Sequence, residues 1–401
     1  MKFVDPKLVY SNSAHGRRGL PAWTYNQPEL TELEFAEIFR KTWLWVCHVS
    51  DIPNPGDFET FELADERAIV IRGDDGVVRS FHNLCRHRAS KVVAGERGSC
   101  EHALVCPFHG WAYHFDGRLK TIPRHNTFPI IDRSSMGLKP IECEVWHGMV
   151  FIRFSGDGPS VAETFAEAEE ELSLYRIGEM NPFDDAWRMD FDLDWKSLVD
   201  IDSEGYHVPI GHPDLFDLVG ASYLDQVTVG GVTRSHCTVD GGSHKSEINR
   251  RYVESLPRES YLPDSHSRQW IYWGSFPGFV ITLFPDQVEI YQSYPTGYQT
   301  SVMAGRSYAL ADDRPEMQRA RECNREINMV VGNEDVELIE WAAAGMRSSA
   351  FDGAVMSDLE VGVVAFQNQL CQKIPVVQEE APPAAGMFAQ KNSEMLKHAA
   401  A

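Results

Sequence analysis

The sequence predicts an α+β fold in which a small antiparallel β domain precedes a larger domain of strands and long helices. Two strand-like runs, Arg67–Arg72 and Val77–Phe81, flank Gly73–Gly76, which is typical of a β-hairpin. Strand-like runs recur between residues 186 and 310, and a helical pattern follows from Pro315 to Ala344. Strands followed by long helices indicate an α+β protein. A chain of 401 residues has room for two or three domains.

The first part of the chain is expected to begin with a helix and to continue as strands. Residues 28–42 are predicted to form a short helix, because Thr31 and Glu34 have capping-box spacing ahead of apolar positions. Residues 111–120 contain a second hairpin signal around an Asp-Gly turn. Val145–Phe154 is predicted to be one further strand of this β domain.

The second part of the chain is expected to form a sheet and then long helices. Residues 161–175 are predicted to be an acidic, solvated helix. The helix from Pro315 is expected to be interrupted at Gly332-Asn333, and the residues from Gln378 on form a loosely held tail. The predicted strands are 186–198, 225–239, 268–280, 281–293 and 299–310.

Charge and composition exclude several classes of protein. The 59 acidic and 37 basic residues give a net charge of −22. Such a surface repels nucleic-acid phosphates and anionic membranes. No run approaches the roughly 18 apolar residues of a spanning helix, and the start, Met1–Pro6, has no apolar signal core. We therefore expect a soluble, cytoplasmic protein that binds neither nucleic acid nor membrane.

A first cluster of thiols and imidazoles lies in the β domain. Cys85 and His87 form a C-x-H pair, and Cys106 and His109 form a C-x-x-H pair. Thiolate and imidazole ligands suit zinc or an iron–sulfur cluster. Two histidines in place of two cysteines on one iron define a Rieske [2Fe–2S] centre. Since C-x-H is unusual for zinc, the spacing favours a Rieske centre over a zinc site or four unrelated core residues.

A second cluster contains two histidines five residues apart, His207 and His212. On a continuous helix this spacing would turn the two side chains about 140° apart. Pro209 and Gly211 break the helix between them, so both rings can reach one metal. Two imidazoles and one carboxylate form the facial triad that binds non-haem Fe(II). A pair of surface histidines in a turn is the alternative.

The third ligand must be a carboxylate from elsewhere, and Asp335 is the first choice. It shares a predicted helix face with Leu338, Ile339 and Ala342, and an acid on an apolar face needs a partner. Glu334 falls on another face and is expected to be solvated. Three further acids remain rivals for the same role: Asp352, Asp358 and Glu360.

The two clusters together resemble the catalytic (alpha) subunits of the Rieske non-haem iron oxygenases. The resemblance covers roughly residues 20–370 and rests on C-x-H…C-x-x-H followed by Trp195-Lys196…Glu204-x-Tyr206-His207-x4-His212. It implies an oxidoreductase that uses O₂, with a Rieske [2Fe–2S] cluster and a mononuclear Fe(II). The implied cluster ligands are Cys85, His87, Cys106 and His109, and the implied iron ligands are His207, His212 and Asp335.

The resemblance also implies a domain order and an assembly. It places an N-terminal helical segment at 1–42, a Rieske domain at 43–155, a helix-grip (START-like) catalytic domain at 156–377 and a tail at 378–401. Members of the family form ring-shaped homotrimers, some with added beta subunits. They receive NAD(P)H electrons from a separate reductase, directly or through a ferredoxin.

The same resemblance gives Glu204 a role in electron transfer. In this family an acid at this position joins the first iron histidine to a cluster histidine of the neighbouring subunit, and the more familiar residue is Asp. The Glu is similar to the branch that oxidises quaternary amines such as carnitine and glycine betaine, whereas Tyr206 is typical of ring hydroxylases. Asp200 and Asp202 add acidity nearby without an assigned role.

The primary expectation is hydroxylation of a small aromatic or heteroaromatic substrate, and the alternative is oxidation of a quaternary ammonium compound. The aromatic-rich strands at 268–293 are expected to line the pocket. An aromatic acid would need an apolar pocket with an Arg, whereas a cation would need several ring faces. An electron carrier without the iron site and a zinc-stabilised binding protein are the competing classes.

Charge is unevenly spread around the first cluster. Between Phe81 and Arg124 there are seven basic and three acidic residues. We expect this locally basic region to attract an acidic ferredoxin-like donor.

Overall fold

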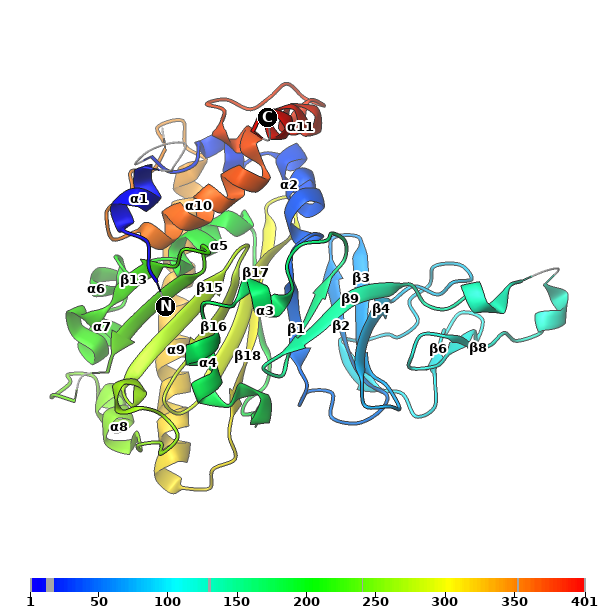
Figure 1. The fold of residues 1–401 in the computed structure, drawn as a ribbon. Coiled ribbons are helices and arrows are strands. Elements are labelled where there is room, and N and C mark those ends of the chain that lie inside the picture. Colours follow the sequence, from blue (N-terminus) through cyan, green and yellow to red (C-terminus); the bar gives the residue numbers. More distant parts are fainter. Residues whose placement is uncertain (1, 12–17, 129–130, 240, 352, 400–401) are drawn as a thin grey trace. The chain divides into compact units, whose positions relative to one another are not determined.

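The computed structural model describes residues 2–11, 18–128, 131–239, 241–351 and 353–399, which fold as two compact units (Figure 1). The β unit comprises Arg40–Val161. The mixed unit combines the residues up to Phe39 with those from Ala162 on. The predicted α+β class is confirmed. Among the helices described, none is long and apolar enough to cross a membrane.

The β unit is built from antiparallel strands in two sheets. Its larger sheet has the order β1-β10-β9-β4-β3-β2-β5, and its smaller sheet the order β6-β7-β8. The strands are β1 Leu44–His48, β2 Asp57–Leu63, β3 Glu66–Arg72, β4 Val78–His82, β5 Arg97–Ser99, β6 Leu104–Val105, β7 Ala112–Tyr113, β8 Leu119–Thr121, β9 Pro140–Trp146 and β10 Met149–Arg153.

Both predicted hairpins are present, since β3 pairs with β4 and β7 pairs with β8. The single strand predicted at Val145–Phe154 is wrong. The chain turns at His147-Gly148, where both residues have positive φ. β9 and β10 lie on either side of this turn and pair antiparallel. A histidine in this conformation is uncommon, which is why the sequence did not predict the turn.

The mixed unit contains one antiparallel sheet with the order β11-β18-β17-β16-β15-β14-β13, and β12 also pairs with β18. Its strands are β11 Asn181–Pro182, β12 Trp187–Phe191, β13 Leu224–Val227, β14 Thr233–Thr238, β15 Gln269–Ser275, β16 Phe279–Leu283, β17 Val288–Gly297 and β18 Thr300–Ala309. The helices, in chain order, are α1 Pro6–Ser11, α2 Pro28–Glu34, α3 Val161–Thr164, α4 Glu169–Leu172, α5 Trp195–Asp202, α6 Val208–Gly211, α7 Pro213–Val219, α8 Glu247–Ser255, α9 Pro315–Met346, α10 Val361–Lys373 and α11 Phe388–Ala399.

Four of the predicted strands have different boundaries in the structure. The predicted strand 225–239 is an antiparallel pair, β13 and β14, and the predicted strand 268–280 contains β15 and the start of β16. The predicted strand 186–198 ends with β12 at Phe191, and α5 begins at Trp195, where the Asp194 side chain accepts a hydrogen bond from the Lys196 amide. This N-cap starts a helix inside a run that looks strand-like by composition. The predicted strand 281–293 is divided between β16 and β17, which are adjacent antiparallel strands.

The long helices cover the sheet and are more continuous than predicted (Figure 1). α9 is one helix from Pro315 to Met346, so the interruption expected at Gly332-Asn333 is absent from this described stretch. A glycine inside a helix costs only about 1 kcal/mol, and apolar contacts of α9 with the sheet outweigh it. The buried residues of this contact include Ala320, Cys323 and Ile327 of α9 with Trp270 and Phe284. The predicted loose tail from Gln378 contains a helix, α11. The single solvated helix predicted at 161–175 is wrong, because α3 and α4 are separate short helices and Glu171 of α4 is buried.

A buried ion pair holds the N-terminal helix to α5. The expected capping box at Thr31 is wrong, because α2 starts with Pro28 and both Thr31 and Glu34 are buried within it. A carboxylate oxygen of Glu34 lies 2.6 Å from Lys196 Nζ, and Asp194 lies 2.8 Å from the same nitrogen. Burial raises the pKa of Glu34 to about 7, although Lys196 opposes this shift. Lys196 is thus the cation that balances two buried carboxyl groups.

Removing this cation is predicted to destabilise the mixed unit. Lys196→Met leaves Glu34 and Asp194 buried without a positive charge, which costs about 3–5 kcal/mol of the free energy of unfolding. Urea unfolding followed by tryptophan fluorescence measures the change. The control is Arg188→Met, which breaks an exposed pair with Asp190 and should cost less than about 1 kcal/mol. Equal losses in the two variants would contradict the prediction.

Candidate metal centres and substrate cavity

In the β unit, two similar loops carry the four predicted cluster ligands. The carbonyl of Cys85 accepts a hydrogen bond from the Ala89 amide, and that of Cys106 accepts one from the Gly110 amide, both at 2.9 Å. Ala89 and Gly110 have positive φ. Each cysteine therefore opens a tight loop of five residues that turns its side chain and the following histidine toward the other loop.

The two loops bring like side chains together. The thiols of Cys85 and Cys106 are buried, and burial raises the pKa of the Cys85 thiol. The Tyr113 hydroxyl lies 3.3 Å from Cys85 Sγ. The rings of His87 and His109 lie 4.6 Å apart, centre to centre. Two thiols on one side and two imidazoles on the other match the ligand arrangement of a Rieske cluster.

An unpaired nitrogen supports the same interpretation. Nδ1 of His87 is buried and has no hydrogen-bond partner among the described residues. Trp111 stacks on this imidazole with a ring distance of 5.2 Å and an angle of 4°, so the ring is held in place. Because buried polar atoms are nearly always satisfied, a metal bond to this nitrogen fits the site.

In the mixed unit, the structure brings His207, His212 and Asp335 together. The Nε2 atoms of the two histidines lie 3.1 Å apart. Asp335 Oδ1 lies 3.0 Å from His212 Nε2 and 3.6 Å from His207 Nε2. This oxygen is buried and makes no hydrogen bond of acceptable geometry with the residues described. Three ligand atoms converge on one point, so the residues fit a metal ion.

Two carboxylates orient the imidazoles from behind. Glu204 Oε1 lies 2.5 Å from His207 Nδ1, and Glu334 Oε2 lies 2.9 Å from His212 Nδ1. These bonds leave each Nε2 free for a metal, which is the usual carboxylate–histidine–metal arrangement. The expectation that Glu334 is solvated is therefore wrong. Burial lowers the pKa of His207, but Asp335 and Glu204 outweigh it and raise that pKa to about 10, so the site attracts positive charge.

Short helices and two glycines allow this convergence. α5 ends at Asp202, and α6 spans only Val208–Gly211 between the two histidines. A side chain at Gly205 would approach the Tyr223 ring to 2.0 Å, and one at Gly211 would approach Leu338 of α9 to 2.9 Å. Both positions need glycine because the backbone packs directly on these side chains.

The other expected acids do not join the cluster. Asp358 is exposed, and Glu360 accepts a hydrogen bond from the Ser357 amide at the start of α10. Asp352 lies outside the described residues. The buried face of α9 differs slightly from the predicted one, since Ile339 and Ala343 are buried and Ala342 is exposed.

The mixed unit has a cavity near this site, since Asp202 in its wall is close enough to Asp335 and His207 for both to influence its pKa. The cavity encloses about 520 Å³, part of which is open to solvent. Aromatic side chains form much of its wall, as expected for the strands at 268–293, and Asp202 and Ser203 at the end of α5 also line it. Its aromatic residues are Tyr272, Phe276, Phe279 and Phe366.

Comparisons with known protein families agree with this architecture. Residues 42–142 match the model of the Rieske [2Fe-2S] domain, and residues 183–375 match that of the ring hydroxylating alpha subunit (catalytic domain). The chain therefore belongs to the Rieske non-haem iron oxygenases, oxidoreductases that incorporate O₂. Members of this family contain a [2Fe–2S] cluster and a mononuclear iron.

Individual relatives fall into two groups. The chain is 32% identical over 202 residues to the glycine betaine monooxygenase oxygenase subunit of Chromohalobacter salexigens, a match that spans 50% of this chain and 45% of that protein. It is 26% identical over 392 residues to the carnitine monooxygenase oxygenase subunit of Escherichia coli, which covers 92% and 97%. It is also 34% identical over 210 residues to the 2-aminobenzenesulfonate 2,3-dioxygenase alpha subunit of an Alcaligenes species, which covers 51% and 52%.

Among solved structures, the fold is similar to that of a quaternary ammonium Rieske monooxygenase. The TM-score is 0.77 at 21% identity, and the match covers 93% of this chain and 99% of that one.

The bond between Glu334 and His212 leads to a prediction about metal affinity. Glu334→Gln should lower the iron affinity of the three-residue site by about 10- to 100-fold, because the imidazole loses its orienting carboxylate. Glu337→Gln is the matched control, since this exposed acid lies on the same helix. Iron content after dialysis against a graded chelator measures the change, and the visible spectrum of the cluster should be the same in both variants. Equal iron retention in the two variants would show that Glu334 has no such role.

Proposed function

We propose that this protein is the terminal oxygenase of a multicomponent system that oxidises a quaternary ammonium or related cationic amine. The observation that carries the proposal is the cavity beside the three-residue site, whose wall combines aromatic rings with a carboxylate, Asp202. Ring faces and a carboxylate attract cations. Relatives named for glycine betaine and carnitine support the same choice.

We favour oxidation of a quaternary ammonium compound, the alternative expectation, over hydroxylation of an aromatic substrate, the primary one. An aromatic acid would require a basic residue in the pocket, and the described cavity wall contains none. The relative named for 2-aminobenzenesulfonate keeps ring hydroxylation as the second candidate. The substrate test below separates the two.

His207, His212 and Asp335 would hold the mononuclear iron, and Cys85, His87, Cys106 and His109 would hold the cluster. Together the two centres supply O₂ activation and electrons. Hydroxylation of a C–H bond consumes O₂, two electrons and two protons and releases water. When that carbon is bonded to nitrogen, the C–N bond of the resulting carbinol breaks. The electron pair stays with nitrogen, the hydroxyl proton is released, and an amine and a carbonyl compound are formed.

The residues around the iron site have separate tasks in this reaction. Glu204 and Glu334 hold the imidazoles at Nδ1, so that both Nε2 atoms face the metal position. The rings of Phe276 and Phe366, whose centres lie 5.8 Å apart, form an apolar part of the cavity wall. Glu204 would also accept a hydrogen bond from a cluster histidine of a neighbouring subunit in a homotrimer. A quaternary ammonium Rieske monooxygenase of similar fold, described with inter-subunit electron transfer, supports this arrangement.

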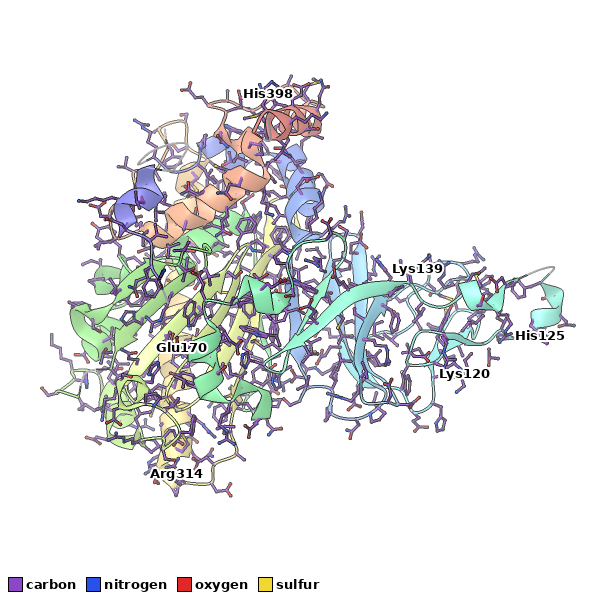
Figure 2. All side chains as sticks on the ribbon, in the orientation of Figure 1. Lys120, His125, Lys139, Glu170, Arg314 and His398 are labelled. Atoms are coloured by element: carbon purple, nitrogen blue, oxygen red, sulfur yellow. The ribbon has the colours of Figure 1, made fainter. Side chains whose placement is uncertain are left out.

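A separate reductase, directly or through a ferredoxin, would supply the electrons. Basic residues near the cluster support docking of an acidic donor there. Figure 2 shows Lys120 and His125 projecting from the β6–β8 end of the β unit. Arg88 lies over the exposed Phe108 ring at 5.4 Å.

The substrate class can be tested by oxygen uptake. Chemically reduced protein, freed of excess reductant, is mixed with oxygen and with quaternary amines, aromatic acids or arenes. We expect uptake with stoichiometric amine and carbonyl product from a quaternary amine, at a rate at least about tenfold above that with arenes, a difference of about 1.4 kcal/mol in barrier. Accumulation of a cis-diol or phenol from an aromatic compound would overturn the proposal in favour of ring hydroxylation.

The bridging role of Glu204 predicts a kinetic defect. Glu204→Gln keeps the length and one acceptor oxygen but loses the charge that holds two imidazole N–H groups. Both metal centres should be retained, while product formation in a single turnover slows by at least about tenfold. Asp214→Asn, which alters an exposed acid next to His212, serves as the control. Unchanged single-turnover kinetics in the Glu204 variant would reject the role.

A further inference from the structure

One charged residue lines the cavity among the described residues of its wall, and it is Asp202. The other polar groups of the wall are hydroxyls and one amide, while the remaining surface is aromatic or aliphatic. The polar uncharged residues are Ser203, Thr233, Ser235, Tyr272, Ser275 and Gln369. The described wall therefore offers one negative charge and no Lys, Arg or His to balance it.

Asp202 is open to the cavity and enclosed by protein. It is the last residue of α5, and its side chain is exposed. The Tyr291 hydroxyl donates a hydrogen bond to Asp202 Oδ1 at 2.8 Å. Desolvation by the surrounding protein, together with Asp335 nearby, raises the pKa of its carboxyl to about 7 even though Tyr291 opposes the shift. No salt bridge to Asp202 is found in the described part of the chain, so its ionised form has no cation beside it, and a bound cation would favour that form.

Three buried carboxylates of the mixed unit differ from Asp202 in having a cation beside them, and buried Asp286, which accepts a hydrogen bond from the Tyr252 hydroxyl, does not line the cavity. Glu34 and Asp194 share Lys196, and Glu171 pairs with Arg234 at 2.8 Å. A carboxylate on a cavity wall that has no cation beside it attracts one electrostatically. The substrate is the group that can supply the cation at Asp202, because the cavity is where a ligand would enter.

We infer that Asp202 binds the positive nitrogen of the substrate and determines specificity for it, and that the substrate is an amine cation without a carboxylate. The inference rests on the proposed function and deepens it. A zwitterion such as carnitine or glycine betaine would need a basic partner for its carboxylate, and the described cavity wall supplies none. This chain therefore differs in its preferred substrate from the relatives named for those compounds.

The neighbouring groups suit a methylated nitrogen. Tyr272 and Phe276 are partly exposed side chains in the same wall, and their ring faces attract methylammonium groups. Asp202 ends α5, and His207 follows five residues later, directly before α6. The carboxyl of Asp202 is close enough to Asp335 and His207 for both to influence its pKa. A nitrogen held at Asp202 would thus place its attached carbon atoms beside the iron site, where C–H hydroxylation takes place.

The test measures binding to the metal-loaded protein by calorimetry, without reductant. Three matched probes are used: (3-hydroxypropyl)trimethylammonium, its neutral carbon isostere 4,4-dimethylpentan-1-ol, and the zwitterion 3-(trimethylammonio)propanoate. We expect the wild type to bind the cation at least about tenfold more tightly than either of the others, which corresponds to about 1.4 kcal/mol. Asp202→Asn should abolish the preference of cation over isostere and leave the affinity for the isostere within about twofold.

Thr233→Val is the matched control, because it changes the same wall without changing charge. It should alter the affinities for cation and isostere by the same factor, so that their ratio stays constant. Melting temperature and cluster spectrum establish that each variant is folded. Rescue of the cation preference by Asp202→Glu, at reduced affinity, would support a direct charge contact.

Several results would overturn the inference. They are equal weakening of cation and isostere in Asp202→Asn, tightest binding of the zwitterion by the wild type, and no measurable binding of the cation. The proposed function fails separately. If a quaternary amine is oxidised and Asp202→Asn keeps the cation preference, only the role of Asp202 falls. If the cation preference depends on Asp202 but no amine is oxidised, the role of Asp202 in cation binding is supported and the proposed oxidation is rejected.

Discussion

The catalytic half of the molecule depends on a break in the helix between His207 and His212. Five residues of continuous helix would turn these side chains about 140° apart. Here α6 is a single short turn, and α7 starts afresh at Pro213. The Nε2 atoms consequently approach to 3.1 Å, and Asp335 reaches them from α9. Gly211 allows α9 to come this close, so the break and the packing on α9 are two parts of one arrangement.

Carboxylates serve three physical purposes around α5, and their partners distinguish them. Lys196 neutralises Glu34 and Asp194, and this pair attaches the N-terminal helix to the catalytic core. Glu204 and Glu334 accept hydrogen bonds from imidazole N–H groups at Nδ1 and so set the direction of the two Nε2 atoms. Asp202 has a hydroxyl partner and an open cavity in front of it. A carboxylate that forms an ion pair within the protein contributes to the fold. A carboxylate that faces a cavity without a cation can bind a cationic ligand.

Local chemistry was predictable where it depends on neighbours in the chain. Two hairpins of the β unit, β3–β4 and β7–β8, followed from turns of Gly and Asp between strand-like runs, whereas the β9–β10 hairpin was missed. The two Cys and His pairs of the β unit were found from the C-x-H and C-x-x-H spacing. Predictions failed where the conformation of a residue depends on contacts with residues far away in the sequence. Glu34 has capping-box spacing with Thr31, but its carboxylate is buried and bonded to Lys196, which is 162 residues away in the sequence. Gly332 is a helix breaker by propensity, yet it lies within α9 because the helix as a whole packs on the sheet.

The sequence by itself determined the class of protein, since the types and spacing of the cysteines and histidines define which metals can be bound and how each loop must turn. The tertiary structure determined which carboxylates lie beside these cysteines and histidines. Glu334 meets His212 across 122 residues of chain, and Asp202 and Tyr272 meet in one cavity from a helix and a strand. Spacing along the chain encodes geometry over a few residues. Pairing of a charge with its partner depends on which elements pack together, and only the folded core specifies that.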